Sequence, residues 1–364
     1  MKKHYNIEFL RFAFSVIIVY FHILHSNIMP YTDGHGTYID LQQMCRMAYT
    51  LVEAFLIIGG YFIYTSWVKT PNKPFAEFAL HRFFRIWPVF AFYMICFTLM
   101  KGDITENTLL DVALLRATGL SLTFTEIVWY VAPFFWSSLL MFAILKTAKK
   151  QSAGLIIALI SYFGYLINLN YMDGGAGAAV IWNSISLAML RVMAGLGIGI
   201  LIGMAMSELS AVYQIETPPR GRLAVFLFSL TEAICGGLLL CIVLFRRPHI
   251  NNIFSVVVIF SVLFVCFINH LGIFSRLLNK PIFACMGRYS YSIYVMQQIS
   301  FDIMEETIWQ NTDLICNYEL ITILLSVAFS VFVGVVTYYL VERPTYSFFK
   351  KWEMDHKRVR NIVN

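Results

Sequence analysis

The sequence has few charged residues for its length. Lysine, arginine, aspartate and glutamate make up only 13% of the 364 residues, whereas 59% of the residues are hydrophobic and the mean hydropathy is +0.69. Soluble domains contain roughly 25% charged residues. This composition excludes an ordinary soluble protein, because the apolar excess has to face lipid.

The sequence also lacks the motifs of several common enzyme classes. It contains no His-Glu-x-x-His zinc motif, no Gly-x-Ser-x-Gly nucleophile elbow and no phosphate-binding loop with a lysine. The seven cysteines have no metal-binding spacing. A disulfide between Cys45 and Cys316 is an option near the outer surface, but two free thiols are the simpler expectation. We expect no bound metal, and the absence of a linker rich in proline and serine indicates a single membrane domain.

Apolar runs of about 20 residues recur along the whole chain, and a helix of that length crosses the hydrocarbon core of a bilayer. We therefore predict an all-α, polytopic integral membrane protein with ten transmembrane helices. The predicted spans are residues 7–26, 45–67, 86–100, 127–145, 153–170, 184–206, 223–245, 252–274, 282–300 and 320–341.

The distribution of basic residues predicts the orientation. With the N-terminus in the cytoplasm, roughly twenty lysines and arginines fall on the inner side and about five on the outer side, in agreement with the positive-inside rule. Both termini are then cytoplasmic. The first apolar run has no small-residue cleavage site, so we expect it to remain as the first helix. We assign residues 1–345 to a transmembrane domain and residues 346–364 to a basic cytoplasmic tail.

The net charge of +6 comes from the inner loops and this tail. Basic residues in these places lie beside anionic lipid headgroups, so we expect membrane lipids as partners and no nucleic acid. Three longer outer segments, near 27–44, 101–126 and 301–319, are either gates for an acceptor or plain connectors between helices. The sequence leaves the oligomeric state open.

The first predicted helix carries the most informative polar residues, because ionisable side chains inside a span are costly and are functional candidates. Arg11 and His22 are close to three helical turns apart, so they lie on one face, about 16 Å apart along the axis. The arginine can hold an anion, and the histidine can accept a proton near neutral pH. The alternative is structural: Arg11 pairs with Glu8, and His22 bonds a neighbouring helix.

A second pattern predicts close helix packing. Gly195, Gly199 and Gly203 recur at every fourth position of one predicted span, which creates a small-residue face for a neighbouring helix. Arg191 precedes these glycines, and Glu232 lies in the next predicted span. We expect structural partners for both charged side chains.

Motifs along nearly the whole chain resemble the acyltransferase-3 family of polytopic membrane acyltransferases. The most specific one is a basic residue, ten further residues and a histidine in the first helix, which Arg11 and His22 match. The others are the stretch from Ile7 to Arg11, Glu53 to Tyr61, Arg82 to Pro88, Trp129 with Tyr130, Ser290 to Tyr294, and Val341 to Pro344. Two positions depart from the family pattern: Gly59 stands where serine is common, and Gln297 stands where histidine is frequent.

The resemblance implies transfer of an acyl group, usually acetyl from cytoplasmic acetyl-CoA, to a hydroxyl of a surface glycan, envelope polysaccharide or lipid-linked sugar. It makes His22 the base or acyl carrier and Arg11 the residue that steers the donor. Arg82 and Arg85 are expected to bind the CoA phosphates, because guanidinium groups bind phosphate through two parallel hydrogen bonds. The alternative for this arginine pair is ordinary inner-side topology.

Four further residues are expected to support the site. Glu8 or Glu53 can orient an arginine or the histidine, and Tyr291 belongs to one of the matching motifs. Gln297 can hydrogen-bond a substrate but cannot act as a base, so His22 carries more of the expected chemistry. The pattern is closest to bacterial members in the plasma (inner) membrane.

Two other functions fit a polytopic helical protein with buried charges. A proton-coupled transporter is the first, although the two halves of the sequence show no convincing repeat. A non-catalytic family member within an envelope-polymer assembly complex is the second. Acyl-CoA turnover by the purified protein separates the enzyme from both.

Overall fold

In the computed structural model, the described part of the chain comprises residues 4–25, 44–102, 106–115, 118, 127–171, 180–181, 185–213, 219, 221–246, 249–310 and 319–363. Most of the predicted outer segment 27–44, and Cys316, lie outside these residues. Cys45 lies inside them as a buried free thiol, and its burial raises the pKa of the thiol to about 11.

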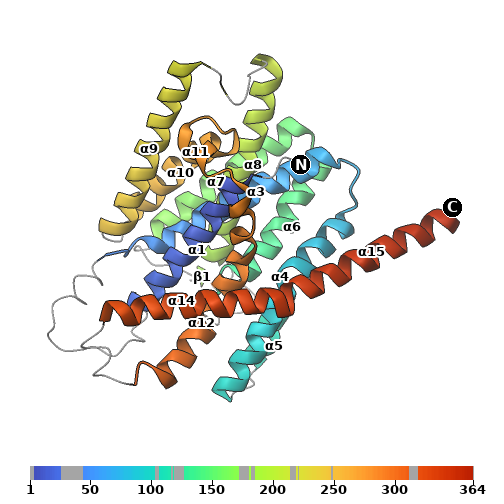
Figure 1. Cartoon of the computed structure of the whole chain (residues 1–364). Coiled ribbons are helices and arrows are strands. Elements are labelled where there is room, and N and C mark those ends of the chain that lie inside the picture. Colours follow the sequence, from blue (N-terminus) through green and yellow to red (C-terminus); the bar gives the residue numbers. More distant parts are fainter. Residues whose placement is uncertain are drawn as a thin grey trace.

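The described chain is almost entirely helical (Figure 1). Its helices are α1 (Tyr5–His25), η1 (Ala48–Leu51), α3 (Val52–Lys69), α4 (Phe75–Lys101), α5 (Glu106–Val112), α6 (Val131–Thr147), α7 (Lys150–Tyr171), α8 (Leu187–Tyr213), α9 (Arg222–Phe245), α10 (Ile250–Ile268), α11 (Ile273–Leu277), η2 (Pro281–Ala284), α12 (Met286–Thr307), α14 (Glu319–Thr337), the π-helical turn η3 (Tyr338–Glu342) and α15 (Arg343–Val363). The two strands, β1 (Val180–Ile181) and β2 (Ile185–Ser186), form one short antiparallel pair.

Seven helices among the described residues are long and apolar enough to cross a membrane. They are Tyr5–His25, Ala48–Lys69, Phe75–Lys101, Lys150–Tyr171, Leu187–Val212, Arg222–Phe245 and Leu320–Asp355. Two apolar helices, Val131–Thr147 and Asn252–Ile268, are shorter, and α12 is long but carries polar residues such as Arg288 and Asp302. The protein is a multi-pass membrane protein; the count of ten spans and the cytoplasmic termini stay predictions.

Two helices extend beyond their predicted spans. The helix of the third span, expected from residue 86, starts at Phe75, because hydropathy does not register a helix whose first turns are polar. The helix of the last span, expected to end at residue 341, continues through η3 into α15. Pro344 has no N–H for the preceding helical turn, and the π-helical turn directly before it accommodates that change.

Glycines bring α3 and α8 into close contact, as the spacing of Gly195, Gly199 and Gly203 predicts. A Cβ atom on Gly199 would overlap the carbonyl oxygen of Ile57 on α3, and a Cβ atom on Gly60 would overlap the backbone of α8. Small residues on both helices therefore let the two backbones touch. This contact sets the distance between two polar side chains near the N-terminal ends of these helices, Glu53 on α3 and Arg191 on α8.

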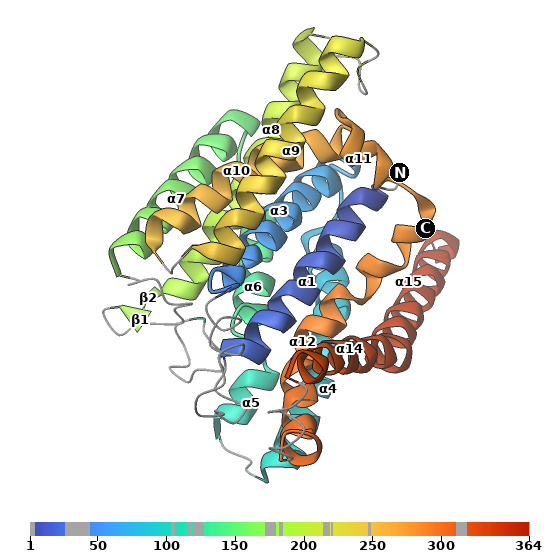
Figure 2. The ribbon, with the colours of Figure 1, turned by 60° about the vertical axis from the view of Figure 1, so that its left-hand side comes forward.

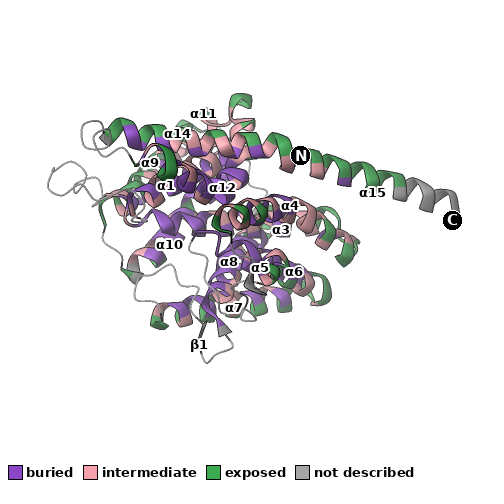
Figure 3. Ribbon diagram, turned by 90° about the horizontal axis from the view of Figure 1, so that it is seen from below, coloured by how far each residue is buried: buried purple, intermediate pink, exposed green. Residues whose placement is uncertain are grey.

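The helices α1 and α12 lie side by side in the centre of the molecule (Figure 2), and α14 packs against both of them. At Gly287 of α12, the nearest atoms belong to Glu8 of α1. The helix α15 continues from α14 and projects beyond the bundle (Figures 1 and 3).

Buried residues fill the centre of the bundle and exposed residues lie on its outside (Figure 3), and many of the exposed residues are large and apolar. On α9 the exposed apolar residues are Leu223, Phe226, Leu227, Leu230, Ile234, Leu238, Leu240 and Phe245. An apolar exterior of this extent fits lipid rather than water as the surrounding medium.

Candidate active site

Three polar residues of α1 are candidates for the site. Glu8 and Arg11 lie at the site, and His22 lies further along the helix. Arg11 contacts Glu8 with a nitrogen to oxygen distance of 3.2 Å, as the structural alternative expects, and it also lines a cavity. His22 lies three turns away, beside the ring of Phe21 at 4.9 Å between centroids. His22 is not among the residues that line the arginine cavity, so its chemical role stays a prediction.

Arg82 and Arg85 lie one turn apart on α4 and face the same cavity as Arg11. Arg82 lies over the rings of Phe78 and Phe134, at 5.4 and 5.6 Å from their centroids. Among the described residues, no carboxylate pairs with Arg82. Its guanidinium donors therefore remain available to a ligand.

Arg85 is held by a residue from the other end of the chain, Glu342. The nitrogen to oxygen distance is 3.4 Å, and the buried carboxylate of Glu342 also accepts a hydrogen bond of 2.6 Å from the Ser292 hydroxyl. Glu342 is the last residue of the π-helical turn η3, and such turns are frequent at functional sites. Sequence reasoning did not assign a role to Glu342, although its Glu-Arg-Pro motif was the available signal.

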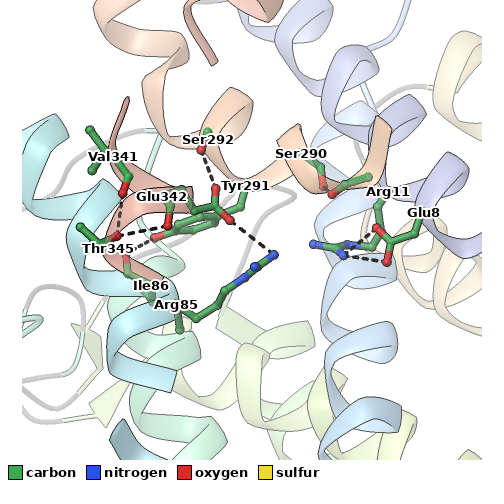
Figure 4. Close-up of polar contacts among 11 residues, drawn as sticks. Glu8, Arg11, Arg85, Ile86, Ser290, Tyr291, Ser292, Val341, Glu342 and Thr345 are labelled. Atoms are coloured by element: carbon green, nitrogen blue, oxygen red, sulfur yellow. Dashed lines mark hydrogen bonds and ion pairs between the residues drawn. The ribbon is translucent and has the colours of Figure 1, made fainter. Parts of the chain in front are cut away.

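The close-up in Figure 4 shows the guanidinium groups of Arg11 and Arg85 pointing toward one another from two different helices. The Tyr291 hydroxyl donates a hydrogen bond of 2.7 Å to the carbonyl oxygen of Ile86 and thereby ties α12 to α4. Three of the recognised motifs, around Arg82, Tyr291 and Glu342, thus meet in space. Packing of α4, α12 and η3 is what joins them.

The cavity between these helices has a volume of about 210 Å³. Its lining residues are Arg11, Phe55, Ile58, Gly59, Phe62, Arg82, Arg85, Ile86, Tyr130, Val131, Phe134, Ser290 and Tyr291. Three cations face it, whereas two carboxylates of the described residues, Glu8 and Glu342, pair with them. The excess positive charge in an apolar surrounding suits an anionic ligand.

A layer of aromatic residues bounds this cavity on the side toward the start of α8. The rings of Tyr130 and Tyr294 lie 4.7 Å apart, and those of Trp129 and Tyr130 lie 6.1 Å apart. The hydroxyl of Tyr294 donates a hydrogen bond to the carbonyl oxygen of Ile127. The motif that begins with Trp129 thus separates the arginine cavity from a second polar cluster.

The second cluster contains the predicted supporting residue Glu53, and its partner is Arg191 rather than any arginine of the cavity. The Nε atom of Arg191 donates to Glu53 over 2.5 Å, and the Tyr165 hydroxyl donates to the other carboxylate oxygen over 2.5 Å. The guanidinium of Arg191 lies over the ring of Trp129 at 5.2 Å. All of these groups are buried.

Gln297 lies in the interior of α12 and is fully buried. Neither its amide nitrogen nor its amide oxygen has a hydrogen-bond partner among the described residues. It does not line the arginine cavity. An amide without hydrogen bonds in the core costs stability, and an apolar residue at position 297 would avoid that cost. Gln297 is therefore a candidate for a contact with the substrate.

Two other features of the described residues were candidates for a site. Glu77, His81 and Glu353 bring potential metal-ligand atoms within 4.8 Å of one another, but His81 already pairs with Glu353 at 3.2 Å and thereby fastens α15 to α4. A larger cavity of about 550 Å³ lies between α3, α8 and α10, has a mostly apolar lining and contains none of the predicted site residues. Charge and motif content favour the smaller arginine cavity.

Repeated membrane-crossing helices and a central cavity lined by three arginines define a multi-pass membrane protein with a positively charged cavity. A family model described as an acyltransferase domain matches residues 4–341, nearly the whole chain. The chain therefore belongs to the acyltransferase-3 family, and the family implies an acyltransferase. Neither the curated proteins nor the solved structures contain a match to this chain.

Proposed function

We propose that the protein transfers an acyl group, preferably acetyl, from cytoplasmic acyl-CoA to a hydroxyl of an envelope or surface glycan or of a lipid-linked sugar. The observation that carries this proposal is Arg82, which faces the cavity between Arg11 and Arg85 and has no carboxylate partner among the described residues. A phosphate of CoA supplies the missing negative charge, and it binds guanidinium groups through paired hydrogen bonds.

The other two arginines are oriented for the same ligand. Glu8 holds Arg11 from α1 and Glu342 holds Arg85 from η3, so both guanidinium groups are fixed before the donor arrives. Such preorganisation reduces the entropy that binding has to overcome. In the proposed topology this cavity opens toward the cytoplasm, where CoA is found, and the protein lies in a bacterial plasma membrane.

The proposed chemistry uses His22, three turns beyond Arg11 on α1. In direct transfer, the acceptor oxygen attacks the thioester carbonyl carbon, the C–S bond breaks, and His22 passes the hydroxyl proton to the departing CoA thiolate. In the two-step form, a ring nitrogen of His22 attacks the thioester carbonyl carbon, the C–S bond breaks, and the departing CoA thiolate takes a proton from the acylated imidazole. The acceptor oxygen then attacks the acyl carbon, the C–N bond breaks, and the hydroxyl proton returns to the imidazole. Both forms need neutral imidazole.

Acyl transfer by purified protein in lipid nanodiscs tests this proposal. We expect radiolabelled acetyl-CoA to be consumed by the wild-type protein, at a rate that His22→Ala lowers by at least about 100-fold. His249→Ala, which changes an exposed histidine beside α10, is the matched control and should keep the wild-type rate. Wild-type turnover by His22→Ala would remove His22 from the mechanism.

The acceptor class is tested in cells. Envelope polysaccharides from cells with and without the gene should differ by one acetyl group in mass spectrometry. The family match favours this enzyme over the transporter reading; flux of a substrate into liposomes without acetyl-CoA consumption would reverse that preference.

A further inference from the structure

Arg191 has bonding capacity that the protein itself does not use. The side chain is only 2% exposed, and its two terminal nitrogens have no hydrogen-bond partner among the described residues. A buried donor without a partner costs free energy, and the cost is greater for a charged group. A purely structural ion pair with Glu53 explains the Nε atom of Arg191 and leaves its two terminal amino groups unexplained.

The charge of this cluster is already balanced. Glu53 takes one hydrogen bond from the Nε atom of Arg191 and another from the Tyr165 hydroxyl. Unlike the cavity around Arg82, the cluster has no excess positive charge. An added carboxylate or phosphate would be a net negative charge in a buried place, which is unfavourable. The free N–H groups therefore fit a neutral oxygen acceptor.

The walls of the cluster are aromatic. Trp129 lies against the guanidinium of Arg191, and the hydroxyl of Tyr165 donates to the Glu53 carboxylate that holds the same arginine. Such a combination of aromatic faces and oriented polar groups suits a sugar ring, which presents both C–H groups and hydroxyl oxygens.

Residues near His22 also approach the cluster. Phe21 contacts the ring of His22 at 4.9 Å and the ring of Tyr49 at 6.0 Å, and Tyr49 belongs to η1, which directly precedes the helix of Glu53. The predicted proton acceptor therefore lies near the end of α3 that carries Glu53. Arg11, Arg82 and Arg85 instead line the cavity that Tyr130 bounds.

We propose that Arg191, oriented by Glu53, binds hydroxyl oxygens of a neutral, non-acidic sugar acceptor. This assignment rests on the proposed acyl transfer and specifies its acceptor site and acceptor class. The terminal nitrogens have no contact with solvent, so a sugar reaches them only when the surrounding side chains move apart. Binding of the acceptor therefore has to be measured directly as well as through turnover.

The first experiment compares kinetic constants of three proteins in nanodiscs. Arg191→Lys keeps a cation for Glu53 but removes the forked donors, and the double variant Arg191→Met with Glu53→Gln removes the pair without leaving a charge alone. We expect each variant to raise the acceptor KM by about 10- to 100-fold. The KM for acetyl-CoA is measured for each variant as well, so that a specific loss of acceptor binding is distinguished from a general loss of the fold. Unchanged acceptor KM in folded variants overturns the proposal.

The second experiment uses neither acyl donor nor turnover. Thermal stability of the wild-type protein is measured with a neutral methyl hexoside and with the corresponding uronic acid glycoside. The neutral sugar should raise Tm in the wild type and not in Arg191→Lys. A larger shift with the uronic acid, or equal shifts in both proteins, contradicts the assignment. Absence of acetyl-CoA consumption by the wild type would instead refute the acyl-transfer function, and this binding result would still decide the role of Arg191.

Discussion

Two arginine sites lie on opposite sides of one aromatic layer, and they differ in how their charge is balanced. In the cavity, three arginines face two carboxylates and Arg85 remains 37% exposed. Behind the layer, Arg191 is 2% exposed and has one carboxylate partner, Glu53, which is fully buried. The excess positive charge that faces the cavity is suited to binding an anion. In the buried and balanced pair, Glu53 orients Arg191, and the pair is suited to a neutral ligand.

The largest effect on stability is expected from substitutions that break the ion pair of Arg191 with Glu53. Arg191→Met or Glu53→Gln alone leaves one partner of a buried ion pair uncompensated, which should lower the free energy of unfolding by about 3 to 5 kcal/mol. The double variant should recover most of this loss. Thermal unfolding in detergent measures both quantities. A double variant as unstable as the sum of the single ones would show that the two residues do not act as a pair.

The next effect concerns the unbalanced site. Arg82→Ala should raise the KM for acetyl-CoA by about 100-fold, because it removes charge-assisted hydrogen bonds to a phosphate. Folding should be little affected, since no carboxylate among the described residues would lose its partner with Arg82. Arg222→Ala, an exposed arginine at the start of α9, is the control and should keep the wild-type KM. Equal effects of both variants would point to general electrostatics instead.

A smaller effect is expected at the contact between α3 and α8, the helices that contain Glu53 and Arg191. Gly199→Ala places a Cβ atom against the carbonyl oxygen of Ile57 and should destabilise the protein by about 1 to 3 kcal/mol. Gly236→Ala adds a Cβ atom that meets nothing within 4 Å among the described residues outside its own helical backbone, and it should be neutral or slightly stabilising because alanine favours helix. Thermal unfolding of the pair measures the difference; similar Tm values would contradict the close approach of α3 and α8.

The smallest effect concerns a polar group that belongs to neither arginine site. Gln297→Leu removes a buried amide without a partner and should stabilise the protein by about 1 kcal/mol. If the amide binds substrate, acyl transfer falls at the same time. Ser330→Ala removes another buried hydroxyl without a partner and should leave transfer unchanged. Full activity of Gln297→Leu together with higher stability would exclude a substrate contact.

Local patterns predicted several parts of the structure correctly. The helical class follows from the apolar runs, and the four-residue spacing of Gly195, Gly199 and Gly203 predicts a close helix contact, whose partner proves to be α3. The helical period also places Glu8 beside Arg11. Each of these depends only on residues close in sequence or on the medium around the chain.

Other parts were not predictable from local patterns. Hydropathy misplaces the start of α4, because Arg82 and Arg85 belong to an apolar helix whose first turns are polar. Glu53 pairs with Arg191 over a separation of 138 residues, and no property of either residue alone identifies the other as its partner. The role of Glu342 was missed for the same reason.

The sequence by itself determined that this chain is a helical membrane protein of the acyltransferase-3 family, because hydropathy and short motifs are properties of the residues in order. Only the tertiary structure decided which charges meet. Packing of α3 on α8 neutralises Arg191, and packing of α4 against η3 fixes Arg85. Arg82 is left without a carboxylate partner in the part of the chain that the structure describes. Contacts between distant residues depend on how helices approach one another, and that is settled by the fold as a whole.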